Sequence, residues 1–243
     1  MARWRGIDIS EFQGYIDFDK VKAAGIDCII IRYGDGLYQD IYFERNMKEA
    51  QKRGFHFGAY LLSRAVNKAQ GKEEGQRLIK ACKRYNFDMP LYIDMEAAEI
   101  SRFADTVIDG FLEACQEAGV TGGVYANLNW FNNYISTKRL KNYPLWMAQY
   151  YDRITHYMPE WFGIWQYTSK GSCPGISENV DLNHVYVDYW NKKESKAYTD
   201  QDKIKAVDVL FGKYGAGDER AKKLGKDYEA VQSLVNEIIE RIT

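Results

Sequence analysis

The sequence predicts an α/β protein, a helix-depleted (β/α)8-like barrel followed by a small three-helix bundle. Three observations predict this architecture. Apolar residues make up 46% of the 243 residues, which is enough for a sizeable core. Eight short apolar runs occur along the chain, and helix-like stretches separate the first five of them. The composition then changes after Trp190, where the strand-like runs stop.

Short apolar segments bounded by turn residues define the candidate strands, at residues 3–9, 28–34, 57–63, 90–96, 122–127, 144–150, 163–169 and 179–186. Helix-like stretches lie at 17–25, 42–54, 67–85 and 101–119, and three of these four end on glycine, a frequent helix stop. Later connections carry little helical pattern, and "NLNWFNNYI" (127–135) is expected to be loop and rim packing. Eight strands with helices between the first five indicate a parallel barrel. A doubly wound open sheet is the alternative, although no GxGxxG turn opens a helix.

Charge and the scattered cysteines and histidines weaken several function classes. The net charge of −1 gives no support for a nucleic-acid partner, and no apolar run is long enough for membrane insertion. The cysteines form no CxxC pair, and the default reading is a set of buried free thiols at Cys28, Cys82, Cys115 and Cys173. The three histidines lack metal-ligand spacing, so we expect no metal and no other cofactor.

Acidic side chains gather at predicted strand ends. In "LYIDMEAAE" (91–99), Asp94 and Glu96 are two residues apart, so they share one face with Cα atoms roughly 6.5–7 Å apart. Asp8 lies near the end of the first strand and Asp181 begins the last, and these strands become neighbours when a barrel closes. Crowded carboxylates raise one another's pKa, which suits glycoside hydrolysis. Spacing alone also fits turn formers or half of a divalent-metal site.

The end of the chain has a different pattern from the barrel. "NKKESKAYTD" (191–200) is polar and charged, as linkers are, and it separates a domain at 1–190 from a module at 201–243. Within the module, apolar residues recur at helical spacing on one face, at Tyr228, Val231, Val235, Ile238 and Ile242. Two further helical pieces flank the glycine-containing turn "GKYGAG", so a three-helix bundle is predicted.

An ordered set of motifs then suggests a family. "RGIDISEFQG", "IIIRYGDG", "FGAYLLS", "YIDMEA", "GGVYAN", "PLWMAQY", "IWQYTSKG" and "ENVDLN" follow one another across residues 3 to 184. Together they resemble glycoside hydrolase family 25, the Chalaropsis-type lysozymes common among phage endolysins. The resemblance implies a flattened, helix-depleted (β/α)8-like barrel. It also implies hydrolysis of the β-1,4 bond between N-acetylmuramic acid and N-acetylglucosamine in peptidoglycan.

The resemblance also implies roles for the acids. Glu96 would be the general acid that protonates the departing oxygen. Asp94 would stabilise the oxocarbenium or orient the sugar's 2-acetamido group as an internal nucleophile. Asp8 and Asp181 would tune this pair and hold substrate. The sequence leaves covalent, assisted and water-attack routes open.

Residues in the motif strands fit a sugar cleft. Flat rings stack on pyranose faces, amides bond hydroxyl or acetamido groups, and an arginine pairs a carboxylate or the lactyl acid of muramic acid. The candidates for these contacts are Arg32, Tyr60, Tyr125, Trp146, Gln149 and Gln166. Core packing is the alternative for each aromatic residue.

The C-terminal segment is similar to the choline-independent cell-wall-binding repeat of some pneumococcal phage lysozymes. One copy covers residues 202 to 241, with a G-x-G-x-x-R turn followed by "DYEAVQ". This resemblance implies a three-helix module that binds muropeptide, and Gly217, Asp218 and Arg220 are its candidate binding residues. Such repeats often occur in several copies, and a single copy lacks avidity within one chain.

Three classes of function remain open at this point. A muramidase acting on peptidoglycan glycan strands and muropeptide, as an endolysin in host lysis, is favoured. A related chitinase or endo-glucosaminidase and an inactive wall-binding protein are the alternatives. Because "MARWRGIDIS" contains no secretory h-region, we expect synthesis in the host cytoplasm and action on the wall after release. The sequence does not indicate an oligomeric state.

Overall fold

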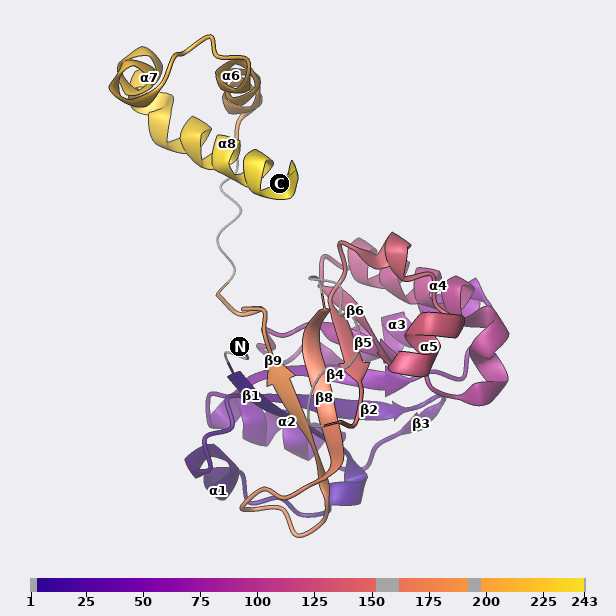
Figure 1. The fold of residues 1–243 in the computed structure, drawn as a ribbon. Coiled ribbons are helices and arrows are strands. Elements are labelled where there is room, and N and C mark those ends of the chain that lie inside the picture. Colours follow the sequence, from indigo (N-terminus) through magenta and orange to yellow (C-terminus); the bar gives the residue numbers. More distant parts are fainter. Residues whose placement is uncertain (1–3, 152–161, 192–197, 243) are drawn as a thin grey trace. The chain divides into compact units, whose positions relative to one another are not determined.

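The computed structural model describes residues 4–151, 162–191 and 198–242 (Figure 1). The chain divides into two compact units, Met1–Trp190 and Asn191–Thr243, and each is described by itself. Most of the predicted linker, 191–200, lies outside the described residues. Its last residue already begins a helix, because Thr199 caps the helix that starts at Asp200.

A closed eight-stranded barrel forms the first unit, as predicted. Its sheet runs in the order β1-β9-β8-β7-β6-β5-β4-β2, and β1 pairs with both β2 and β9 to close it. A short strand, β3 (Tyr38–Gln39), extends β2 outside the closed ring. The barrel strands are β1 (Trp4–Ile9), β2 (Cys28–Asp35), β4 (His56–Leu62), β5 (Leu91–Asp94), β6 (Gly122–Asn127), β7 (Leu145–Ala148), β8 (Phe162–Gly171) and β9 (Val180–Val185).

The last strand corrects the prediction of a parallel barrel. β9 runs antiparallel to both of its neighbours, β8 and β1, whereas the other barrel strands pair in parallel. The connection from β8 to β9 consists of residues 172–179 only. A parallel crossover needs a dozen or more residues, so this short connection makes a hairpin.

Helices cover the outside of the first half of the barrel. They are α1 (Phe18–Ala23), α2 (Phe43–Lys52), α3 (Lys68–Cys82) and α4 (Ala104–Glu117), with the 3₁₀ turns η1 (Glu11–Gln13) and η2 (Ala98–Phe103). α3 and α4 lie side by side (Figure 1). Their close approach requires glycine at Gly110, where an added Cβ would meet the carbonyl oxygen of Lys68 at 2.0 Å. The helices therefore pack backbone against backbone at this point.

The stretch 127–135, expected to be loop, contains a helix. α5 (Leu128–Asn133) begins because the Asn127 side chain accepts a hydrogen bond from the Trp130 N–H at 3.1 Å, an N-cap that the sequence reading missed. Trp130 and Phe131 are buried, so the expected rim packing is present. A 3₁₀ turn, η3 (Thr137–Leu140), follows before β7. Among the described residues between β6 and β9, helical structure is thus limited to α5 and η3.

Alternate residues of each strand supply two hydrophobic clusters. Ile29 and Ile31 of β2 belong to the larger cluster, which the helices also join, whereas Ile30 belongs to a second cluster made mostly of strand residues. This second cluster fills the barrel interior with aromatic rings, including Tyr92, Tyr125 and Trp146. The four cysteines are free and buried, as expected.

Three helices form the second unit, which confirms the predicted bundle. They are α6 (Asp200–Leu210), α7 (Gly217–Leu224) and α8 (Tyr228–Ile242), and a 3₁₀ turn, η4 (Gly225–Asp227), precedes the last. Their core contains Ala206, Val209, Leu224, Val231 and Val235. Among the residues that the structure describes, none of the helices has the length and apolar character of a membrane span.

Candidate active site

The barrel brings the four predicted acids together at the carboxyl edge of its parallel strands. Asp8 and Asp181 are direct cross-strand partners of β1 and β9. Asp94 is the last residue of β5, and Glu96 follows two residues later. The acids act on one another electrostatically: Glu96 raises the pKa of Asp94 and of Asp181, and Asp181 raises the pKa of Asp8.

Asp8 is buried and held by two amides. Its Oδ2 accepts hydrogen bonds from Gln166 Nε2 at 2.9 Å and Asn183 Nδ2 at 2.8 Å. Burial and then the charge of Asp181 raise the pKa of Asp8 well above its usual range, although both amide bonds favour the anion. Asn183 is itself fixed, because its Oδ1 accepts from the indole Nε1 of Trp146 at 2.8 Å. Asp8 therefore has one defined orientation.

Asp94 is equally buried but less well satisfied. Only 4% of the residue is exposed, and its Oδ1 has no hydrogen-bond partner among the described residues. Burial, followed by the charges of Glu96 and Asp8, raises the pKa of Asp94 well above its usual range. An ionised carboxylate in this position gains strongly from any cation or N–H donor that approaches it.

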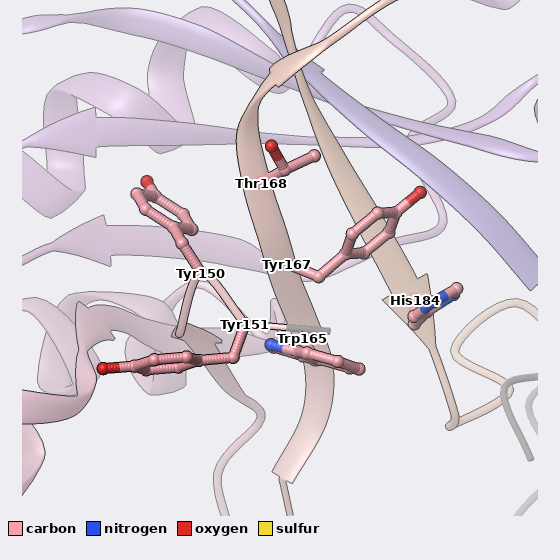
Figure 2. A pocket seen from close by; sticks show the side chains of 6 residues that line it. All are labelled: Tyr150, Tyr151, Trp165, Tyr167, Thr168 and His184. Atoms are coloured by element: carbon pink, nitrogen blue, oxygen red, sulfur yellow. The ribbon is translucent and has the colours of Figure 1, made fainter. Parts of the chain in front are cut away.

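Glu96 is the exposed member of the set and faces a cavity of about 500 Å³. Desolvation of its carboxyl group raises the pKa of Glu96, and nearby Arg64 opposes this shift. The cavity lies between the carboxyl ends of β6 and β7 and the residues that follow them. Its lining comprises Glu96, Tyr125, Asn127, Leu128, Asn129, Ala148, Gln149, Tyr150 and Tyr151. Tyr150 and Tyr151 also line a neighbouring pocket with Trp165, Tyr167, Thr168 and His184 (Figure 2).

Three of the residues predicted to contact sugar make contacts inside the protein, and they are Tyr125, Trp146 and Gln166. The Oε1 of Gln166 accepts hydrogen bonds from Tyr125 and Tyr150, both at 2.9 Å, while its Nε2 holds Asp8. Trp146 is 1% exposed and packs edge-on against Tyr60 and Tyr92, so it offers no ring face to a sugar. Trp146 and Gln166 thus position Asp8, a role that strand patterns alone do not indicate.

The other residues predicted to contact sugar are Arg32, Tyr60 and Gln149, and they differ in their surroundings. Arg32 pairs carboxylates of its own chain, with Nε 3.0 Å from Asp40 and Nη2 2.8 Å from Glu11. Arg32 thus already neutralises two carboxylates within the protein. Tyr60 is half-buried against Trp146 at 5.8 Å between ring centroids. Gln149 is buried, and it lines the Glu96 cavity together with Tyr125.

Sequence reasoning missed a second layer of charged residues at the same edge. Arg64, after β4, forms ion pairs with Asp35 at the end of β2 and with Glu99 in η2. The buried carboxylate of Glu74 on α3 accepts hydrogen bonds from the Ser63 hydroxyl at 2.6 Å and the Arg64 N–H at 3.0 Å. Their position in the sequence could have indicated these charged residues, because Asp35 and Arg64 each directly follow a predicted strand.

A metal site is not apparent in the part of the chain that the structure describes, where no three His, Cys, Asp or Glu side chains cluster as ligands.

In the second unit, Arg220 stabilises a turn. Its guanidinium donates to the carbonyl oxygen of Gly215 from Nε at 3.0 Å and from Nη2 at 2.8 Å, and to Gln232 Oε1 at 2.9 Å. Gly217 and Asp218, at the start of α7, are exposed, and Gly217 has a φ of 53°. Arg220 thus shapes the loop that presents these two residues.

A closed α/β barrel with a cluster of carboxylates at the carboxyl ends of its strands defines the class of barrel glycosidases. Residues 7–176 match the model of glycosyl hydrolases family 25, and the chain belongs to this family. Residues 205–239 match the CW_7 repeat.

Several relatives of known identity are similar to the first unit. An autolytic lysozyme of Clostridium acetobutylicum is 27% identical over 190 residues, covering 74% of this chain and 55% of the relative. Lysozyme M1 of Streptomyces globisporus is 27% identical over 201 residues, covering 74% and 66%. The solved modular autolysin LytC of Streptococcus pneumoniae is 27% identical with a TM-score of 0.67, covering 74% of this chain and 46% of that one. The chain thus spans about half to two thirds of the length of these relatives.

Proposed function

We propose that the chain is a peptidoglycan hydrolase that cleaves the β-1,4 bond between N-acetylmuramic acid and N-acetylglucosamine. The observation that carries the proposal is the set of four carboxylates at one barrel edge, with Glu96 open to a cavity and Asp94 buried behind it. Membership of glycosyl hydrolases family 25 and the lysozymes among the relatives support it. One solved form of LytC is a complex with a synthetic peptidoglycan ligand.

Glu96 is the general acid in this proposal. It is the most exposed of the four, since Asp181 is half-buried and the other two are buried, and desolvation raises its pKa, so a proton is retained closer to neutral pH. The carboxyl group donates this proton to the oxygen of the departing sugar as the glycosidic bond breaks. Access decides the assignment, because Asp94 also has a raised pKa but is 4% exposed.

Asp94 supports positive charge at the reacting carbon or the attack of the 2-acetamido group. Its unpartnered Oδ1 is a buried acceptor, and the N–H of a 2-acetamido group is a donor of matching chemistry. This hydrogen bond would orient the acetamido oxygen toward the anomeric carbon. Asp8 and Asp181 keep the electrostatic field of the site negative and thereby raise the pKa of their neighbours.

The three-helix unit is proposed to bind muropeptide through the exposed start of α7, where Gly217 and Asp218 lie. Its match to the CW_7 repeat supports this role. Together, a cleaving unit and a wall-binding unit suit an endolysin that acts in host lysis.

Analysis of released fragments tests the proposed bond. Purified peptidoglycan is digested, the new reducing ends are converted to alditols with borohydride, and the fragments are analysed by mass spectrometry. Muramitol ends are expected, whereas glucosaminitol ends would identify an endo-glucosaminidase. Digestion of chitin in parallel tests the chitinase alternative. The Glu96→Gln protein is the matched control, and absence of any cleavage by the unaltered chain would support an inactive binding protein.

A further inference from the structure

Helix α6 of the three-helix unit has an apolar side that the other two helices do not cover. Its inward side packs against α8 (Figure 1), and Ala206 and Val209 are buried there in the core of the unit. Its outward side carries four exposed apolar residues, with exposed fractions of 58% for Ile204, 46% for Val207, 43% for Leu210 and 79% for Phe211. Among the side chains described in this unit, Ile239 on α8 is the one other large apolar side chain that is exposed.

The four residues form one stripe, the α6 face. Ile204, Val207 and Phe211 follow one another at spacings of three and four residues, and Leu210 lies three residues after Val207. Residues at these spacings lie on the same side of a helix. Single exposed apolar residues are ordinary on a protein surface, whereas a contiguous apolar stripe marks an interaction site. An apolar seam with this spacing is suited to packing against a second helix.

Charged side chains stand at both ends of the α6 face. At its N-terminal end, Asp200 and Lys203 pair at 2.9 Å, with 93% and 61% of their side chains exposed. Just beyond its C-terminal end, Lys213 pairs with Asp208 and keeps 64% of its side chain exposed. The face therefore starts beside its most exposed acid and ends beside an exposed base.

This distribution of charge is self-complementary when two copies of α6 meet antiparallel about a two-fold axis at Val207. The apolar residues on either side of the axis then meet each other. Asp200 of one copy lies near Lys213 of the other, and the ammonium of Lys203 lies near the ring of Phe211. A parallel pair would instead bring Asp200 against Asp200 and Lys203 against Lys203, which is repulsive. The charges thus favour an antiparallel second copy of the same helix.

We propose that two copies of the chain associate through the α6 face as an antiparallel two-fold pair centred on Val207. Such an interface is isologous, because one surface serves both copies. The eleven residues of α6 span about 16 Å, so the contact is smaller than a standard interface of roughly 1,200–2,000 Å². Association is therefore weak in dilute solution and grows with the concentration of the chain.

Pairing has a consequence for wall binding, and this part rests on the proposed function. The chain carries one wall-binding repeat, and a pair carries two that are joined through α6. Chains bound at neighbouring positions on a wall have a high local concentration, which favours pairing and makes release depend on both repeats. Occupancy of insoluble wall should therefore rise more steeply with protein concentration than a single-site isotherm.

Sedimentation equilibrium of the full chain tests the pairing without any substrate. The chain has a mass of 28.2 kDa, and the average mass should rise toward 56.4 kDa, twice this value, between about 5 and 500 µM. Val207→Asp places two carboxylates at the axis and should stay at the mass of one chain, with helical circular dichroism retained. Leu37→Asp is the matched control, because Leu37 is an exposed leucine of the barrel unit, and it should associate like the parent.

A cysteine at the axis tests the geometry of the pair. In Val207→Cys the two introduced thiols face each other, and oxidised glutathione should convert them to one intermolecular disulfide. The two thiols lose two electrons and two protons, and the glutathione disulfide becomes two molecules of glutathione. The four native cysteines are buried and do not compete. Lys222→Cys, on the exposed surface of α7, is the matched control and should not cross-link.

Several results would overturn the inference. A constant mass of one chain up to about 500 µM would do so, as would equal cross-linking of Val207→Cys and Lys222→Cys. Association that persists in Val207→Asp would assign the contact to another surface. A monomeric parent in which Val207→Asp increases proteolysis would show that the chain itself covers the α6 face. The cysteine variant decides the question if Val207→Asp does not fold. Wall cleavage is measured separately, so failure of the proposed function leaves the mass and cross-linking results unchanged.

Discussion

Asp8 on β1 and Asp181 on β9 face each other across the antiparallel ladder that closes the barrel. Like charges at directly opposed positions destabilise a sheet. Here the pair forms part of the site, so the fold carries an electrostatic cost at its closing seam. That cost can be measured, and it leads to the first prediction.

Asp181→Asn should stabilise the barrel at neutral pH. Burial and Glu96 raise the pKa of Asp181 to about 6, against about 3.9 in an unfolded chain. The folded state therefore binds this proton more tightly, and stability falls as pH rises from about 4 to about 6. The variant should melt a few degrees higher at pH 7.5, since about 1 kcal/mol shifts the midpoint by roughly 2–4 °C.

Tryptophan fluorescence is the measurement, because all six tryptophans precede residue 191 and report on the barrel alone. The gain should vanish at pH 3.5, where both states are protonated. Glu178→Gln, which alters an exposed acid just before β9, is the control and should melt like the parent. An equal shift at both pH values would contradict the electrostatic explanation.

Glu96→Gln should reduce cleavage of natural wall about 10²- to 10⁴-fold, because it keeps the shape and removes the acid. Asp94→Asn should be similarly severe. The two differ on an aryl glycoside with a good leaving group, which needs little protonation. On the aryl glycoside, Glu96→Gln should recover part of its activity and Asp94→Asn should not. Equal recovery of both would show that the roles are assigned wrongly.

Arg64→Gln should move the alkaline limb of the kcat/KM profile to higher pH. Arg64 lowers the pKa of Glu96, so its removal keeps the general acid protonated to a higher pH. Arg64→Lys retains a positive charge and should preserve most of the profile. Arg84→Gln, an exposed arginine paired with Glu44 on α2, is the control. A shift toward lower pH would be inconsistent with this arrangement.

Glu74→Ala should destabilise the barrel and slow cleavage. It leaves the Ser63 hydroxyl and the Arg64 N–H without their acceptor, at roughly 1–3 kcal/mol for each buried group. The effect reaches the site because the Ser63 N–H donates to the carbonyl oxygen of Asp94 at 3.0 Å.

Glu74→Gln retains an acceptor oxygen and should recover part of both losses, as measured by denaturant unfolding and by turnover of soluble muropeptide. The exposed neighbour Glu73→Ala should have little effect. Full activity in a destabilised Glu74→Ala protein would limit Glu74 to a structural role.

Arg220→Ala should lower retention on insoluble wall without changing turnover of soluble substrate. Arg220 holds the Gly215 turn and Gln232, so its loss loosens the start of α7. Lys222→Ala, an exposed residue of the same helix, is the matched control in a co-sedimentation assay. Truncation at residue 195 should likewise spare soluble turnover, and loss of that turnover in a folded fragment would contradict the modular interpretation.

The acids could be predicted from sequence because strand ends are local features. Asp94 and Glu96 need only one strand, and Asp8 and Asp181 need only the rule that the first and last strands meet. The roles of Trp146, Arg32 and Gln166 could not be predicted in the same way. Their partners Asn183, Glu11 and Asp8 lie on other strands or loops, and only tertiary packing decides whether a ring or an amide faces substrate or a neighbour.

The direction of β9 could have been predicted from a local feature. The predicted strands at 163–169 and 179–186 leave only residues 170–178 between them, which is too short for a parallel crossover. Helix α5 was missed because its cap at Asn127 directly follows a strand and the helix that it begins is short.

The closing strand also sets when the active site can exist during synthesis. Asn183 reaches Asp8 across a separation of 175 residues, and the Asp8–Asp181 pair is nearly as distant in sequence. A nascent chain cannot form this seam until β9 has left the ribosome, and such non-local pairing is slow. The acid cluster is therefore the last part of the barrel to be assembled, and a chain that ends before β9 lacks its complete set of carboxylates.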